Sequence, residues 1–175
     1  MNAFWAFFWP LVGFGMLAGV LSGIAGFRRR PGMLVADYRR RRVRFPAGAA
    51  MLCVAAALLW TGPLGGAGRL VAAIDKSVHD DLVYYEMTPI QANLHRAPLT
   101  RRLALSGPAD DFQREQLSLV LSDLPGVSSA MWGDAGGGIP LVVEAAIAAL
   151  LGFAIGLVPA YGVELRRRYN AQWSW

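Results

Sequence analysis

The 175-residue sequence contains very few of the side chains from which disulfides and metal sites are built. It has one cysteine, two histidines and a single lysine, Lys76, against sixteen arginines. Because Cys53 has no second cysteine to pair with, the fold cannot depend on an intrachain disulfide. His79 and His95 lack the paired spacing of a metal site, and the chain shows neither a phosphate-cradling glycine loop nor a nucleophile elbow. The sequence therefore predicts a protein that is no enzyme and that binds no metal and no cofactor.

Charge is missing from long stretches of the chain, and these stretches are apolar. Hydrophobic residues make up 55% of the sequence, and its mean hydropathy is +0.37. We expect three transmembrane helices, in residues 1–27, 46–62 and 139–163. The charge-free run at 3–27 would reach about 37 Å as a helix, enough to cross a bilayer core of about 30 Å. A secretory signal begins with positive charge, whereas this run is followed by it, so we expect the first helix to remain in the mature protein.

Arginine is concentrated at the ends of these stretches and predicts a topology. Eleven of the 17 basic residues lie between the first two stretches or just after the third. The positive-inside rule then places an arginine-rich loop, 28–45, and the tail, 164–175, in the cytoplasm, with the N-terminus and residues 69–134 in the periplasm. We expect the following arginines to contact lipid headgroups or an acidic partner: Arg28, Arg29, Arg30, Arg39, Arg40, Arg41, Arg42, Arg44, Arg166, Arg167 and Arg168.

The location of these arginines also argues against a nucleic-acid function. The formal charge of +5 and the pI near 10.0 would otherwise suggest a polyanion as partner. However, the loop at 64–138 carries 6 basic and 9 acidic residues, so its net charge is −3. The preference for arginine over lysine, with abundant alanine and glycine, favours a bacterial inner membrane. We therefore expect membrane lipids and other membrane subunits as partners, and no nucleic acid.

Tryptophans lie near the ends of the apolar stretches, where aromatic side chains anchor helices at the headgroup layer. Trp5 and Trp9 lie at the start of the first stretch, Trp60 at the end of the second, and Trp173 and Trp175 beyond the last arginines. Tryptophan is enriched at this depth because its ring is apolar and its N–H is polar. We expect these five residues to contact lipid headgroups or a neighbouring subunit.

Small residues recur at helical spacing in two of the stretches. They are Gly15, Gly19 and Gly23 in the first, and Ala148, Gly152 and Gly156 in the third. Helices in lipid gain little from burying apolar surface, so small residues that allow close approach predict contact faces. These faces either pack the helices of this chain together or dock onto another membrane subunit.

Glu144 is the one charged residue within the third stretch. Carboxylates inside a membrane often mark a proton or ion path. This one follows Pro140 by four residues, so we expect it in the first helical turns near the outer interface, where water and the helix dipole tolerate a carboxylate. No further polar groups at mid-membrane accompany it, and a transport role is the least favoured alternative.

The sequence between the second and third stretches has the pattern of a small α/β domain. Leu70, Ile74, Val78 and Leu82 recur every four residues and predict an amphipathic helix. Strands are predicted at 90–96 and 101–106, a second helix capped by Asp110 with Gln113 three residues later, and a third strand at 127–132. The predicted order is helix, strand, strand, helix, strand.

Two short motifs in this region resemble the BON domain, a small α/β module of bacterial envelope proteins. They are the strand Leu103-Ala-Leu-Ser-Gly107 before an acidic helix start at Asp110, and the turn Leu124-Pro-Gly-Val127 before the last strand. The similarity covers about 69–134. It implies a non-catalytic domain that associates with phospholipid or with envelope proteins.

Taken together, these features predict a three-helix membrane protein with a BON-like extracytoplasmic domain. The leading hypothesis is a non-catalytic accessory or scaffold subunit of a larger inner-membrane complex, respiratory or photosynthetic, bound through the small-residue faces and the BON-like domain. The first alternative is a free-standing envelope protein that binds phospholipid of the periplasmic leaflet or envelope partners. The second is a small transporter or channel subunit that uses Glu144.

Overall fold

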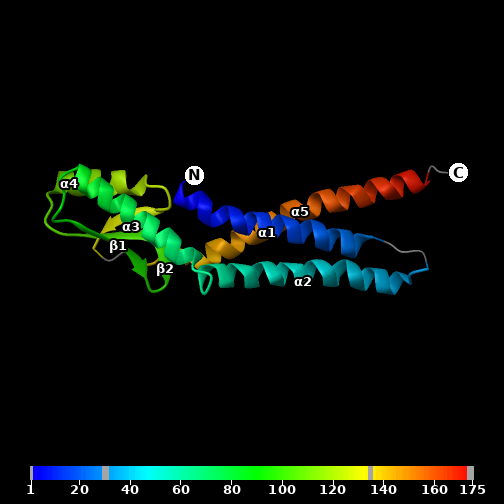
Figure 1. The fold of residues 1–175 in the computed structure, drawn as a ribbon. Coiled ribbons are helices and arrows are strands. Elements are labelled where there is room, and N and C mark those ends of the chain that lie inside the picture. Colours follow the sequence, from blue (N-terminus) through cyan, green and yellow to red (C-terminus); the bar gives the residue numbers. More distant parts are fainter. Residues whose placement is uncertain (1, 29–31, 134–135, 173–175) are drawn as a thin grey trace. The chain divides into compact units, whose positions relative to one another are not determined.

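The computed structural model describes residues 2–28, 32–133 and 136–172 of the chain. Four of the predicted contact residues, Arg29, Arg30, Trp173 and Trp175, lie outside the described residues. The fold is mostly helical, with three long apolar helices and one small sheet (Figure 1).

The three long helices are α1 (Ala3–Phe27), α2 (Val35–Thr61) and α5 (Leu141–Gln172). Each is long and apolar enough to cross a membrane, which confirms the predicted number and type of the apolar helices. The chain divides into two compact units. The helical unit comprises Phe8–Leu59 and Ala145–Trp175, and the α/β unit comprises Met1–Phe7 and Trp60–Glu144.

Two of the long helices extend further than the apolar stretches predict. Helix α2 begins at Val35 rather than at Pro46, and α5 continues to Gln172 rather than ending near Val163. The arginines of 39–44 and 166–168 therefore lie on helices, where a loop and a tail were expected. Arginine has a high helix propensity, and the negative charge of Asp37 in the first turn of α2 interacts favourably with the positive end of the helix dipole. The apolar stretches therefore predict only the part of each helix that is suited to a bilayer. They do not predict where the helix begins or ends.

The α/β unit has the element order that the sequence predicts. Its elements are α3 (Gly66–Tyr84), β1 (Gln91–Arg96), β2 (Leu99–Ser106), α4 (Asp111–Ser122) and β3 (Ser129–Trp132). The strands form one sheet in the order β1-β2-β3, with β1 antiparallel and β3 parallel to the central β2. Two parallel neighbours need a crossover connection, and α4 provides it.

The core of the α/β unit lies between its helices and one face of the sheet. The predicted stripe of α3, Leu70, Ile74, Val78 and Leu82, is buried. In β2 the alternating Leu103 and Leu105 are fully buried, as is Leu121 of α4. A buried leucine contributes about 1.5–3 kcal/mol, so this cluster supplies much of the free energy that stabilises the unit.

The first turn of α4 confirms the predicted capping box. The Asp110 carboxylate accepts a hydrogen bond of 2.7 Å from the Gln113 backbone N–H, and the Gln113 side chain accepts one of 3.1 Å from the Asp110 N–H. Two backbone donors that the helix itself cannot satisfy are thereby satisfied. The cap fixes where the chain turns from β2 into the crossover helix.

Candidate functional site

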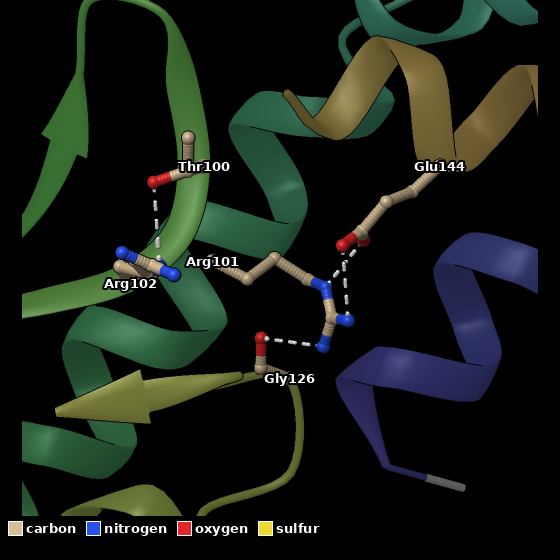
Figure 2. A network of polar contacts seen from close by, with 5 residues as sticks. All are labelled: Thr100, Arg101, Arg102, Gly126 and Glu144. Atoms are coloured by element: carbon tan, nitrogen blue, oxygen red, sulfur yellow. Dashed lines mark hydrogen bonds and ion pairs between the residues drawn. The ribbon is translucent and has the colours of Figure 1, made fainter. Parts of the chain in front are cut away.

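The most developed polar network of the α/β unit centres on Arg101 of β2. Its Nε donates to Glu144 Oε2 at 2.5 Å and its Nη2 to Glu144 Oε1 at 3.2 Å, while Nη1 donates to the Gly126 carbonyl at 3.4 Å. Figure 2 shows the guanidinium between the Glu144 carboxylate and the Gly126 oxygen. Both side chains are 18% exposed, so this two-point ion pair is largely shielded from water. Glu144, which the sequence singles out, is therefore paired with arginine.

The neighbouring Arg102 contacts the segment that leads from β3 to α5. Its Nη1 donates to the Gly136 carbonyl at 3.2 Å. Gly138 has a positive φ of 104°, and a Cβ built there would lie 2.9 Å from Arg102 Nε. The positive φ favours glycine at this position, and the missing side chain leaves room for Arg102. Adjacent arginines on one strand thus hold the linker and the first turn of α5.

Two cation–π contacts extend the network to the N-terminal residues of the chain and to Trp60, where the α/β unit resumes after α2. The Arg101 guanidinium lies 5.3 Å from the ring centre of Phe4, and Arg69 lies 5.1 Å from that of Trp60. The Trp60 Nε1–H donates to the Phe7 carbonyl at 3.2 Å. Cations over aromatic faces are favourable where water is partly excluded. Trp60, predicted to contact lipid headgroups or a neighbouring subunit, is half-buried and makes contacts within the chain.

Sequence reasoning did not identify Arg69, Arg101, Arg102 or Phe4. Arg101 and Glu144 are 43 residues apart, and only the tertiary fold brings them together. The sequence did contain a clue to this pairing. A carboxylate shielded from water needs a cation beside it, and Arg101 and Arg102 on the predicted strand are cations that could pair with Glu144.

In the helical unit, the glycines of α1 and α5 lie against each other's backbone. A Cβ built at Gly15 would lie 2.8 Å from the Phe153 nitrogen, and one at Gly19 would overlap with the Phe153 carbonyl oxygen. On the other side, a Cβ at Gly152 would lie 2.9 Å from the Val12 Cα. Gly23 and Gly156 are equally tight, against Ala160 and Met16. These glycines therefore pack α1 against α5 within this chain.

The contact stripe on α5 differs by one residue from the predicted one. Ala145, Ala149, Gly152, Gly156 and Ala160 are buried, whereas Ala148 is half-buried. The buried series keeps the three- and four-residue spacing of one helix face. Ala149 thus occupies the place expected of Ala148.

Most of the described arginines in the arginine-rich segments are exposed, but several have aromatic or acidic neighbours. Arg42 lies over the rings of Phe27 and Tyr161 at 5.9 and 5.8 Å. Arg168 pairs with Glu164 at 3.0 Å and also donates to the Tyr38 hydroxyl. Arg41 lies 5.1 Å from the ring centre of Phe45. The exposed side chains at the remaining described positions are those of Arg28, Arg39, Arg40, Arg44, Arg166 and Arg167.

Helix α2 is the least covered of the three long helices. In its most apolar window 11% of the residues are buried, against 28% for α1 and 33% for α5. Met51 and Leu58 are 74% and 55% exposed, and Cys53 and Ala57 are its buried residues. Trp5 and Trp9 on α1 are also about half exposed, as expected of residues at a headgroup layer or an interface.

Within the described part of the chain, no group of three or more His, Cys, Asp or Glu side chains could hold a metal ion. His79 is exposed on α3, and His95 Nδ1 lies 3.0 Å from the Pro98 carbonyl oxygen in the turn between β1 and β2.

Comparison with known proteins gives no match: no family model, no curated protein and no solved structure is significantly similar to this chain.

Proposed function

We propose that the protein is a non-catalytic accessory subunit of a larger complex in a bacterial inner membrane, respiratory or photosynthetic. In this proposal α1, α2 and α5 cross the membrane, the N-terminus and the α/β unit are periplasmic, and the C-terminus is cytoplasmic. The α/β unit acts as a BON-like module that contacts envelope lipid or the partner complex. The proposal rests on the helix faces that pack against each other within the chain and on the large share of α2 that stays uncovered.

The observation that carries the proposal is the uncovered surface of α2. The glycine faces of α1 and α5 are occupied by each other, so they are not the surface for a partner. Met51 and Leu58, seven residues apart on one side of α2, are both more than half exposed. An accessory subunit needs a helix of this kind, because membrane helices associate by side-chain packing rather than by excluding water.

The pairing of Glu144 favours an anchoring role over an ion path. A carboxylate that relays ions must exchange partners, whereas this one is held at two points by Arg101. Breaking a shielded pair leaves an uncompensated charge, at a cost of several kcal/mol when the pair is fully buried. We therefore assign Glu144 to the structure of the α/β unit and not to transport.

Photo-crosslinking in native membranes tests the proposal. A benzophenone amino acid placed at Leu58 should give one adduct of defined mass with another membrane protein. The same probe at Leu151, 59% exposed on α5, serves as the control and should give none. Purification in mild detergent should then recover the partner at fixed stoichiometry.

Two outcomes would overturn the proposal. If neither position gives a protein adduct and the chain elutes alone, the free-standing envelope protein that binds phospholipid is the better account. If Glu144→Gln abolishes an ion flux while expression and folding are intact, the transporter account replaces it.

A further inference from the structure

An apolar groove lies between α1 and α2 within the helical unit. Its volume is about 780 Å³, and its lining includes Phe14, Leu17 and Leu21 of α1 and Leu52 of α2. Ser22 also lines the groove, and its hydroxyl donates to the Gly19 carbonyl within α1. Gly48 and Ala49 also line the groove, and their small size leaves it open on the α2 side. The groove is therefore an elongated apolar surface with room for a hydrocarbon chain.

One end of this groove is positively charged. Arg44 and Phe45 line that end, and the Arg41 guanidinium lies over the ring of Phe45. Among the described residues, Arg44 forms no ion pair with an acidic side chain, whereas Arg168 is paired with Glu164. The end of the groove thus presents an arginine charge without a protein anion to balance it.

We propose that this groove binds one anionic phospholipid, with an acyl chain along the apolar lining and the phosphate at Arg44, beside Arg41. Basic pockets between membrane helices recognise anionic headgroups, and an arginine fork matches phosphate oxygens at two points. An apolar groove with a cationic end is complementary to both parts of such a lipid. The site is distinct from the α2 side with Met51 and Leu58. It rests on the proposed insertion of α1 and α2 in a membrane, but not on the accessory role.

Two substitutions separate the contribution of the lipid headgroup to binding from that of its acyl chain. Arg44→Gln removes the charge at the groove, and Arg40→Gln is its matched control on the same helix, outside the groove lining. Gly48→Leu fills the groove, and since a Cβ at Gly48 meets no atom within 4 Å the helix has room for it. Gly162→Leu is the matched control, because Gly162 is equally open and does not line the groove.

The experiment is native mass spectrometry of the full chain, delipidated in mild detergent and titrated with phosphatidylglycerol or with phosphatidylethanolamine of the same acyl chains. The wild type should bind one phosphatidylglycerol in preference to phosphatidylethanolamine. Arg44→Gln should weaken this binding about five-fold, equivalent to about 1 kcal/mol per arginine. Gly48→Leu should weaken both lipids, and the two controls should stay within about two-fold of the wild type. Circular dichroism verifies that each variant is folded.

The proposal is overturned if the two lipids bind alike, or if Arg40→Gln weakens binding as much as Arg44→Gln, since either result indicates general attraction to the arginine-rich helix. It is also overturned if a benzophenone probe at Leu52 gives an adduct with a protein instead of with lipid. In that case the groove is a docking site for another membrane helix.

Discussion

The two units of this chain use apolar side chains in opposite ways. In the α/β unit the large residues Ile74, Leu103 and Leu121 form the core. In the helical unit Leu11 and Phe153 are buried, but many large residues such as Leu17 and Met51 are exposed, and the glycines of α1 and α5 lie against each other's backbone. Water favours the burial of large apolar surfaces, whereas helices in lipid gain from close backbone approach. The core of the α/β unit thus has the packing expected in water, and the contact between α1 and α5 has the packing expected of helices in lipid.

Gly19→Leu tests the small-residue contact and should have the largest effect. The new side chain would overlap with the Phe153 carbonyl oxygen, which as part of a helix backbone cannot move aside. We expect a loss of more than about 3 kcal/mol in the free energy of unfolding, above the usual cost of overpacking. The measurement is unfolding by sodium dodecyl sulfate in mixed micelles. Gly13→Leu is the control, because a Cβ at Gly13 meets no atom within 4 Å; equal losses in both variants would contradict the contact.

Leu121→Ala tests the large-residue core of the α/β unit. Leu121 is fully buried, so its truncation removes apolar contacts and leaves a cavity. We expect a loss of about 3 kcal/mol, measured by urea unfolding of the full chain in detergent and followed by hydrogen exchange in peptides of the α/β unit. Leu119→Ala, at a site 58% exposed on the same helix, should change stability by less than about 0.5 kcal/mol. A core that tolerates both changes equally would refute the assigned burial.

Glu144→Ala compares a shielded ion pair with an exposed one. It leaves Arg101 without its carboxylate at a position 18% exposed, and we expect a loss of about 2 kcal/mol in the stability of the α/β unit. Glu164→Ala removes the partner of Arg168, which is 46% exposed, and should cost less than about 1 kcal/mol. Glu144→Ala is read from the same urea titration, and Glu164→Ala, which lies in the helical unit, from the unfolding by sodium dodecyl sulfate. A larger loss for Glu164→Ala would show that Arg101 and Glu144 are solvated.

Asp110→Ala should have the smallest effect of the four. It removes the 2.7 Å hydrogen bond to the Gln113 N–H and with it the cap of α4, which costs about 1 kcal/mol. Asp111→Ala, which keeps the cap, is the control, and the two are compared by thermal unfolding. If both shift the midpoint alike, the stabilisation comes from negative charge near the helix start and not from the capping box.

Sequence patterns predicted the α/β unit well because its elements are local and periodic. The four-residue repeat from Leu70 to Leu82 and the Asp110–Gln113 spacing each specify one short segment. The extent of α2 was harder to predict, since its arginine-rich start is helical without being apolar.

Contacts between distant segments were beyond the sequence. Helical spacing identified the glycine faces, but Ala148 and Ala149 are adjacent, and only the packing decides which of them is buried. In the same way, the pairing of Arg101 with Glu144 depends on how the sheet is placed against the start of α5. The sequence identified Glu144 and Trp60 of the candidate site, but it did not identify the residues that contact them.

The central claim, that the arginine-rich and the α/β segments lie on opposite sides of a membrane, is tested most directly by thiol labelling. Cys53→Ala gives a cysteine-free chain, into which Ser77→Cys on α3 or Ala36→Cys at the start of α2 is introduced. Both positions are exposed. An impermeant maleimide applied to cells with a permeabilised outer membrane should label position 77 and reach position 36 only after the inner membrane is disrupted. Labelling of position 36 alone, or of both positions, in intact inner membranes would contradict the account.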